Sequence, residues 1–288
     1  FTHIVDAGTV KGPVTKKISD ETGIKNANVI AVASHDSASA VAAIPDFGED
    51  KVYISMGSSI NMGIESDKTG LGDLYYQGGF KNTGGLMRKK LIYRDFTAFW
   101  MINELLSEWK RQGFVYSFDE INYMAAEAKN SSYLNLDDKV LNTAGLSMQR
   151  KIDEYLASTN QPALHSHGEY IRCVYESIAL KVKKTVEDLK KATGREFTEV
   201  FAISGGSRNG LLNQLICDAV NIPLKAGIPH ATIAGNALAQ LYSCGYVSSL
   251  DEIREVSRNS FSLSQYEPKF TKDWDSALEN AVVKGITV

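Results

Sequence analysis

The chain has 288 residues, of which 43% are hydrophobic and 23% are charged, enough for one large or two modest globular domains. Its 31 basic and 34 acidic side chains leave a formal net charge of −3, which gives no sign of a nucleic-acid surface or a polybasic membrane anchor. No apolar run approaches the roughly 18 residues of a membrane span. Small-molecule partners are therefore expected, with neither nucleic acid nor membrane.

The cysteines and the start of the chain bear on its location and extent. Cys173, Cys217 and Cys244 are far apart and form no CxxC pair, which favours a reducing cytoplasm over a disulfide scaffold. The chain opens at FTHIVDAGTVKG, without an initiator Met or a secretory signal, so we expect it to be the later part of a longer protein. The oligomeric state is left open.

Strand-like and helix-like segments alternate along the chain without repeats, which is typical of an α/β fold. The expected strands are 28–34, 51–56, 60–66, 199–204 and 222–227. The expected helices are 95–111, 147–158, 167–192, 208–220, 232–243 and 249–259, of which 167–192 has the clearest three- and four-residue apolar period. Residues 112–146 show no clean period, and we expect irregular helices there.

The stretch AVASHDSASAVAAIP, residues 31–45, passes from a strand-like to a helix-like pattern with His35 and Asp36 at the joint. A carboxylate at a helix start can simply satisfy the free N–H groups of the first turn. It can equally be a catalytic group. This stretch alone leaves both interpretations open.

Two glycine-rich joints are candidate ligand sites. In SMGSSINMG, Gly57 and Ser58 connect two strand-like runs, either as an ordinary hairpin turn or as a turn whose N–H and hydroxyl groups hold phosphate oxygens. In VFAISGGSRNG, Gly205 and Gly206 follow a strand and precede a helix. Bare backbone beside a helix N-terminus suits an anionic or nucleotide ligand.

Several common motifs are absent or incomplete. The chain has no GxxxxGK[ST] loop, and GGSRNG does not match GxGxxG. Ser207 is placed like the nucleophile of a hydrolase elbow, but the final glycine of GxSxG is missing, so a hydrolase is only the runner-up. His165 and His167 could bind a metal from one segment, yet no third ligand accompanies them, and we interpret both as surface or hydrogen-bonding residues.

Six segments in the order ASHDSASAVAAIP, YISMGSS, RCVYESIAL, ISGGSRNGLLNQ, ATIAGNALAQ and SSLDEIREVSRNSF resemble the FGGY family of carbohydrate kinases. The resemblance spans nearly the whole chain. It implies an α/β fold of the actin-like ATPase (ribonuclease H-like) type, a mixed sheet flanked by helices. Family members have two such domains with sugar and ATP between them. Residues 1–28 would then be the end of the N-terminal domain and its connector, and residues 29–288 the C-terminal kinase domain.

The resemblance also implies an activity, in which a kinase phosphorylates a ketose such as rhamnulose, or a related deoxyketose or ketopentose, with ATP and Mg²⁺. Asp36 matches the family's catalytic base, which takes the proton of the attacking hydroxyl. His35 and Ser37 would lie beside the sugar. The implied ATP-binding residues are Gly57, Ser58, Asn103, Gly205, Gly206, Ser207 and Asn209. No metal-binding residue is assigned to this chain.

Four departures from the family pattern affect the expected site, and one of them is Asn103 in place of a nucleotide-contacting glutamine. Ser204 replaces a glycine, and His230 stands where a glutamate is usual. Asp95 replaces a substrate-contacting asparagine, so it can only accept hydrogen bonds from the sugar. On the expected helix 95–111, Asp95 and Asn103 would lie within about 80° of each other. These departures leave a second possibility, a degenerate sugar- or nucleotide-binding protein without transfer activity.

Residues 6–9, near the start of the chain, can be interpreted in two ways. Asp6, Gly8 and Thr9 resemble the DxGT phosphate loop that opens the first domain of this superfamily. Only about fifty residues separate them from Gly57, too few for a whole domain between the two phosphate loops. We therefore expect this segment to be part of the connector.

Overall fold

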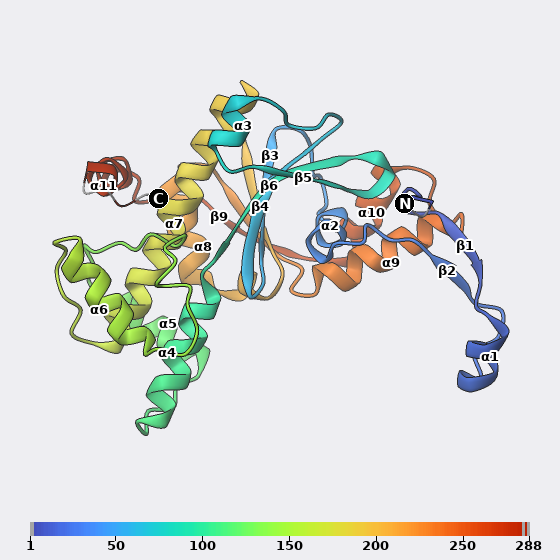
Figure 1. Cartoon of the computed structure of the whole chain (residues 1–288). Helices are drawn as coiled ribbons and strands as arrows, with labels where there is room; N and C mark the ends of the chain where they lie inside the picture. Colours follow the sequence, from blue (N-terminus) through green and yellow to red (C-terminus); the bar gives the residue numbers. More distant parts are fainter. Residues whose placement is uncertain (1–2, 284–285, 287–288) are drawn as a thin grey trace.

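The computed structural model describes residues 3–283 and residue 286, and its centre is a seven-stranded mixed sheet (Figure 1). The strand order is β5-β6-β4-β3-β7-β8-β9, and β7 pairs in parallel with both β3 and β8 while the other pairs are antiparallel. The strands are β3 (Lys51–Met56), β4 (Ser59–Ser66), β5 (Lys81–Gly84), β6 (Lys90–Thr97), β7 (Glu199–Ile203), β8 (Leu224–Gly227) and β9 (Leu263–Tyr266). This is the expected α/β architecture with a mixed sheet.

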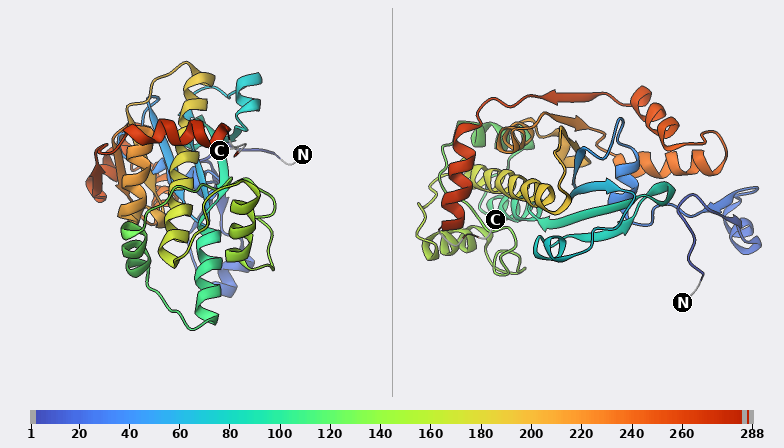
Figure 2. Two further views of the ribbon diagram at one scale, coloured as in Figure 1. Left: turned by 90° about the vertical axis from the view of Figure 1, so that its left-hand side faces the viewer. Right: turned by 90° about the horizontal axis from the view of Figure 1, so that it is seen from above.

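Helices cover both faces of the sheet (Figure 2). On one face lie α4 (Phe99–Arg111), α7 (His167–Thr193) and α8 (Gly210–Val220), while α5 (Phe118–Glu127) packs against α7 and α6 (Met148–Ser158) against α4. The other face packs against α2 (Asp36–Ala42), α9 (Ala231–Ser243) and α10 (Leu250–Ser260). Two further helices are the short α3 (Asp73–Gln77) and α11 (Lys272–Val283). None of the described helices has the length and apolar character needed to cross a bilayer.

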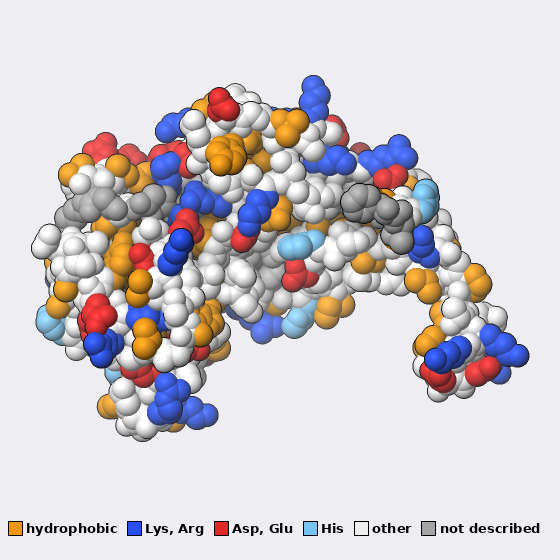
Figure 3. All heavy atoms as spheres, viewed as in Figure 1, with side chains coloured by type: hydrophobic (Ala, Val, Ile, Leu, Met, Phe, Trp, Pro, Cys, Tyr) orange, Lys and Arg blue, Asp and Glu red, His pale blue; other side chains and the backbone are white. Residues whose placement is uncertain are grey.

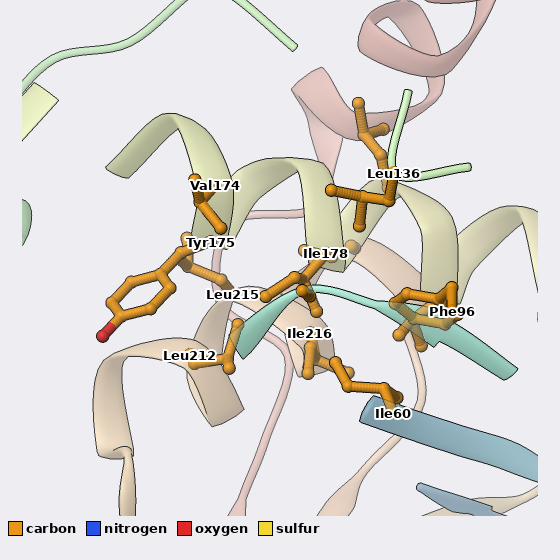
Figure 4. Close-up of a cluster of buried hydrophobic side chains, with 14 of the residues drawn as sticks. Ile60, Phe96, Leu136, Val174, Tyr175, Ile178, Leu212, Leu215 and Ile216 are labelled. Atoms are coloured by element: carbon orange, nitrogen blue, oxygen red, sulfur yellow. The ribbon is translucent and has the colours of Figure 1, made fainter. Parts of the chain in front are cut away.

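The larger core forms where α7 lies across α8 and the sheet. Ile178 of α7 and Ile216 of α8 point towards Ile60 of β4 and Phe96 of β6 (Figure 4). All four side chains are buried, and burying such a side chain contributes about 1.5–3 kcal/mol. The apolar period of 167–192 therefore marks the buried face of a real helix, and that prediction is confirmed.

Residues 10–30 form an arm that stands apart from the sheet (Figures 2 and 3). Strands β1 (Val10–Pro13) and β2 (Asn28–Ile30) pair with each other, and α1 (Lys16–Thr22) connects them. The expected strand 28–34 is thus only three residues long and does not join the main sheet. Over the face shown in Figure 3, basic and acidic side chains are interspersed, in keeping with a net charge near zero.

The expectation of a helix over 95–111 is wrong at its start. Residues Lys90–Thr97 are strand β6, which pairs with β4 along its whole length, and α4 begins only at Phe99 after the non-helical Ala98. Asp95 therefore does not cap a helix, and it does not share a helix face with Asn103. Pairing with a distant strand decided this segment, whereas the sequence pattern is local.

The segment 112–146 contains one regular helix, α5, which starts with a capping box between Ser117 and Glu120. The remainder of the segment is loop, held in part by the fully buried Lys181, whose ammonium donates to Asp137 at 2.5 Å. The expectation of several irregular helices was wrong here. Strands β5 and β9 were also absent from the prediction because both are short edge strands.

Helices α2 and α9 cross with their backbones in contact, and this contact positions the start of α2. A Cβ atom on Gly235 of α9 would come within 1.6 Å of the carbonyl oxygen of Ser39 on α2. Only glycine leaves room for this crossing. The spacing of the two helices therefore depends on the absence of a side chain at Gly235. The position of Asp36 depends on it as well.

We predict that Gly235→Ala lowers the free energy of unfolding by about 1–3 kcal/mol, because the added methyl forces the two helices apart. Urea unfolding followed by circular dichroism measures the change. The matched control is Gly84→Ala in β5, where an added Cβ has no atom within 4 Å and should change stability by less than about 0.5 kcal/mol. Equal stability of the two variants would contradict the close crossing.

Candidate active site

A cavity of about 660 Å³ opens where the sheet meets the starts of α2 and α9. It is lined by His35, Asp36 and Ser37 from α2; by Ser55, Asn61, Lys81, Tyr93 and Asp95 from the strands; by Gly57, Ser58, Ser59 and Ser204 from the turns; and by residues 229–233 before and within α9. The cavity thus brings together five separate parts of the sequence, within 35–37, 55–61, 81–95, 204 and 229–233.

The floor of the cavity is a row of polar side chains across the sheet. Ser55 on β3 faces Asn61 on β4, and Asn61 faces Asp95 on β6. The same side of the sheet carries the apolar Tyr53 and Phe201 further along, beneath α2 and α9. The cavity therefore lies where this apolar layer gives way to polar groups.

Asp36 is the first residue of α2, and His35 precedes it as the N-cap residue without a side-chain capping bond. The Asp36 carboxylate accepts a hydrogen bond from the N–H of Ser37 at 2.7 Å, and His35 Nδ1 lies 3.3 Å from the same oxygen. The side chain is 78% exposed on the cavity side. Asp36 therefore binds the first turn through Oδ1, and its Oδ2 accepts no hydrogen bond from the residues that the structure describes, so capping and catalysis are compatible.

The first glycine joint is a tight hairpin, as its pattern predicted. Gly57 and Ser58 connect the antiparallel β3 and β4, and the N–H of Gly57 bonds to the carbonyl of Ser59 at 3.1 Å. Ser58 is exposed at the cavity, and its hydroxyl makes no hydrogen bond within the described part of the chain. A hydroxyl in this position can bind a phosphate oxygen.

The second glycine joint contributes backbone rather than side chains. Ser207 is buried, and its single hydroxyl proton is shared between the carbonyl oxygens of Ser204 and Gly227, which lie at 2.7 and 3.0 Å. The oxygen of Asn209 caps α8 by accepting from Leu212 N–H. A hydroxyl held in two backbone bonds is a poor nucleophile, so the geometry does not favour the hydrolase alternative.

The two glycines of this joint differ in their surroundings. A Cβ on Gly206 would lie 2.6 Å from Met56 Cβ and 2.7 Å from the ring of Phe99, so glycine is required there by packing. Gly205 faces open space. Of the two, only Gly205 offers free backbone to a ligand in this structure.

Ser204 has a backbone conformation that strongly favours glycine. Its φ of 71° and ψ of −170° fall in a region almost restricted to that residue, at a cost of about 1–3 kcal/mol. Its hydroxyl forms a hydrogen bond of 3.0 Å with Ser55, the first member of the polar row. The replacement of glycine by serine therefore strains the turn and adds a polar link across the cavity floor.

Asp95 lies in the cavity but not beside Asn103. Its carboxylate accepts a hydrogen bond from Lys81 Nζ at 2.6 Å, and this bond raises the pKa of Lys81, so the ammonium stays charged. Asn103 is exposed on α4 and is not part of the cavity lining. The cavity lining thus brings together the predicted sugar-side residues and the first glycine joint. It does not include the other predicted nucleotide-side residues, which are Asn103, Gly205, Gly206, Ser207 and Asn209.

The two histidines that the sequence offered as possible metal ligands, His165 and His167, differ in their surroundings. His167 stacks on Trp109, with ring centroids 4.0 Å apart, and its Nδ1 bonds to the hydroxyl of Tyr116 at 2.9 Å. His165 is exposed. Within residues 3–283 and 286, no group of three or more His, Cys, Asp or Glu side chains is placed to hold a metal ion.

Sequence reasoning missed the strand residues Ser55, Asn61, Lys81 and Tyr93. Asn61 gave one readable signal, because an asparagine inside the buried run INMGIES calls for a hydrogen-bond partner. Lys81 gave none, since its position beside Asp95 arises only from the pairing of β5 with β6.

The mixed sheet with helices on both faces has the actin-like ATPase fold. Among solved structures, xylulose kinase from Rhodospirillum rubrum is similar, with a TM-score of 0.72 at 14% identity over 97% of this chain and 55% of that chain. Plasmodium falciparum glycerol kinase with ADP has a TM-score of 0.70 at 16% identity, over 98% of this chain and 56% of that chain. At such identities the likeness shows the fold alone.

The sequence comparison gives the family. Residues 52–244 match the model of the C-terminal domain of the FGGY family of carbohydrate kinases, and the chain belongs to that family. It is 31% identical over 277 residues to the rhamnulokinase of Bacteroides thetaiotaomicron, and 30% identical over 283 residues to that of Enterococcus faecalis. These matches cover 96% and 97% of this chain but 56% of each relative, so the chain spans little more than half their length.

The strained backbone at Ser204 leads to a prediction about the stability of the folded protein. Ser204→Gly should be more stable than Ser204→Ala by about 1 kcal/mol or more, because both variants lose the bond to Ser55 and only glycine relieves the backbone. Thermal unfolding of the pair measures the difference. Ser55→Ala, which removes the same hydrogen bond and leaves the backbone unchanged, is the control. An alanine variant as stable as the glycine variant would show that the turn carries no strain.

Proposed function

We propose that this chain is the C-terminal half of an ATP-dependent kinase that phosphorylates a hydroxyl group of a ketose. The observation that carries this proposal is the position of Asp36, whose exposed carboxylate shares one cavity with the hairpin turn at Gly57 and Ser58. Rhamnulose, or a related deoxyketose or ketopentose, is the substrate class that we propose, because the similar proteins are named rhamnulokinases.

The chemistry follows from the site. Asp36 accepts the proton of the sugar hydroxyl as that oxygen attacks the γ-phosphate, the role that a carboxylate takes in phosphoryl transfer. The carboxylate is held at the start of α2 by the hydrogen bond that it accepts from the N–H of Ser37. His35 and Ser37 flank this carboxylate in the sequence and line the same cavity, so we place them beside the sugar.

The nucleotide lies on the opposite side of the cavity in this proposal. The backbone and hydroxyl of the Gly57–Ser58 turn bind phosphate oxygens, and the open backbone of Gly205 receives the adenosine. Gly206, Ser207 and Asn209 support this surface by shaping the turn, and Asn103 contacts the nucleotide only at its periphery. Mg²⁺ accompanies ATP, and such ions are bound through the phosphates and one or two carboxylates.

The domain organisation belongs to the same proposal. Residues 1–28 form the connector from an N-terminal domain, and residues 29–288 form the C-terminal kinase domain. The cavity is open, and closure of two domains around the substrates would exclude water during transfer. We place the reaction in the cytoplasm, where ATP is available.

The catalytic role of Asp36 is tested by Asp36→Asn in the full-length kinase to which we assign this chain. We expect kcat for ketose phosphorylation to fall by about two to four orders of magnitude while the affinity for ATP is kept, because the amide preserves shape but cannot take a proton. Coupled detection of ADP release over a panel of ketoses, including rhamnulose, fuculose, xylulose and ribulose, measures the rates.

Asp20→Asn on α1 is the matched control, since this carboxylate is exposed on the arm and away from the cavity. If kcat of the Asp36→Asn enzyme stays within a few-fold of the wild-type value, Asp36 only caps the helix and is not the catalytic base. Wild-type protein that binds a ketose and ATP but transfers no phosphoryl group would favour the alternative, a sugar-binding protein without transfer activity.

A further inference from the structure

The ion pair between Lys81 and Asp95 forms one wall of the cavity. Lys81 Nζ lies 2.6 Å from Asp95 Oδ1, and the two side chains are 57% and 41% exposed. Lys81 sits opposite Tyr93 on β6, so it reaches Asp95 diagonally across the strand pair. This one bond occupies a single N–H of the ammonium and a single carboxylate oxygen, and neither group makes another hydrogen bond within the described chain.

Asn61 presents a third polar group beside this pair. It is only 7% exposed, and its Oδ1 accepts a hydrogen bond of 3.0 Å from the hydroxyl of the fully buried Tyr53. Burial raises the pKa of Tyr53 well above its usual value, so this hydroxyl stays protonated and donates. With Oδ1 accepting from Tyr53, the NH₂ group of Asn61 makes no hydrogen bond among the described residues, and Asn61 lines the cavity directly opposite Asp95.

These three residues combine donors and an acceptor at the spacing of adjacent strands. The ammonium and the amide NH₂ donate, and the carboxylate accepts. Residues paired directly across an antiparallel sheet have their Cβ atoms about 5 Å apart. A hydroxyl group both donates and accepts, so two neighbouring hydroxyls on one sugar match this set of groups.

We propose that Asn61, Lys81 and Asp95 together bind two neighbouring hydroxyl groups of an uncharged sugar and orient it towards Asp36. This inference rests on the proposed function and deepens it by naming the part of the sugar that the sheet recognises. The opposite charges of Lys81 and Asp95 cancel, so the wall favours a neutral polyol over a sugar acid. Asp95 alone offers only an acceptor, and Lys81 supplies the missing donor.

The test is the affinity of the full-length kinase for rhamnulose and for gluconate, measured by calorimetry without ATP so that transfer is not required. Lys81→Met should weaken rhamnulose binding about ten-fold or more, as expected for loss of a charged hydrogen bond. Asp95→Asn should weaken rhamnulose binding too, and it should strengthen gluconate binding, because Lys81 is then an uncompensated cation. Asn61→Leu tests the third residue, and its folding is checked by thermal unfolding.

Lys89→Met is the matched control, because it breaks the Lys89–Asp67 ion pair of similar length, 2.7 Å, outside this cavity. The inference is overturned if Lys81→Met binds rhamnulose as well as Lys89→Met does, if Asp95→Asn gains no affinity for gluconate, or if the wild-type kinase binds rhamnulose no better than gluconate. Failure of the proposed function looks different: the wild-type kinase would bind the ketose yet release no ADP in its presence.

Discussion

The parallel pairing of β3 with β7 is the contact on which the site depends. It joins two segments about 150 residues apart in the chain, in register from Lys51 and Glu199 to Ser55 and Ile203. Parallel strands end at the same edge of a sheet, and ligands of open α/β sheets bind in the crevice beyond that edge. Both glycine turns therefore lie at one end of the sheet, and the bond between Ser55 and Ser204 links them directly.

The two faces of the sheet have different roles, because one carries the larger core and the other carries the cavity. The face under α7 and α8 carries the larger apolar core. On the other face the apolar layer stops short, and polar side chains occupy the ends of β3, β4 and β6 beneath the start of α2. Asp36, Lys81 and Asp95 all remain partly exposed, so the side of the cavity that they line is open to solvent. In our account the preceding domain closes that side around the sugar and the nucleotide.

Much of this organisation could be predicted from the sequence. Long amphipathic helices such as 167–192 report their buried face through local period, and the strand before each glycine turn was recognised by its apolar run. The segment around Asp95 was mistaken for helix because Phe96, Phe99 and Trp100 continue a helical spacing into α4. Its strand character comes from pairing with β4, which no local pattern contains.

The same limit explains the missed wall of the cavity. Lys81 is unremarkable in its own segment, and Asn61 indicates only that it needs a hydrogen-bond partner. The two residues form a site only when two strand pairings bring them beside Asp95. The departure at Asp95 was visible in the sequence, but its charge could be interpreted only once Lys81 was found 2.6 Å away.

The most direct measurement is a crystal structure of the full-length kinase with rhamnulose and a non-hydrolysable ATP analogue. Our account predicts one sugar hydroxyl within hydrogen-bond distance of Asp36, about 2.6–3.2 Å, facing the γ-phosphate. It also predicts two neighbouring hydroxyls on Asn61, Lys81 and Asp95. A sugar bound with all its hydroxyls out of reach of Asp36 would contradict the account.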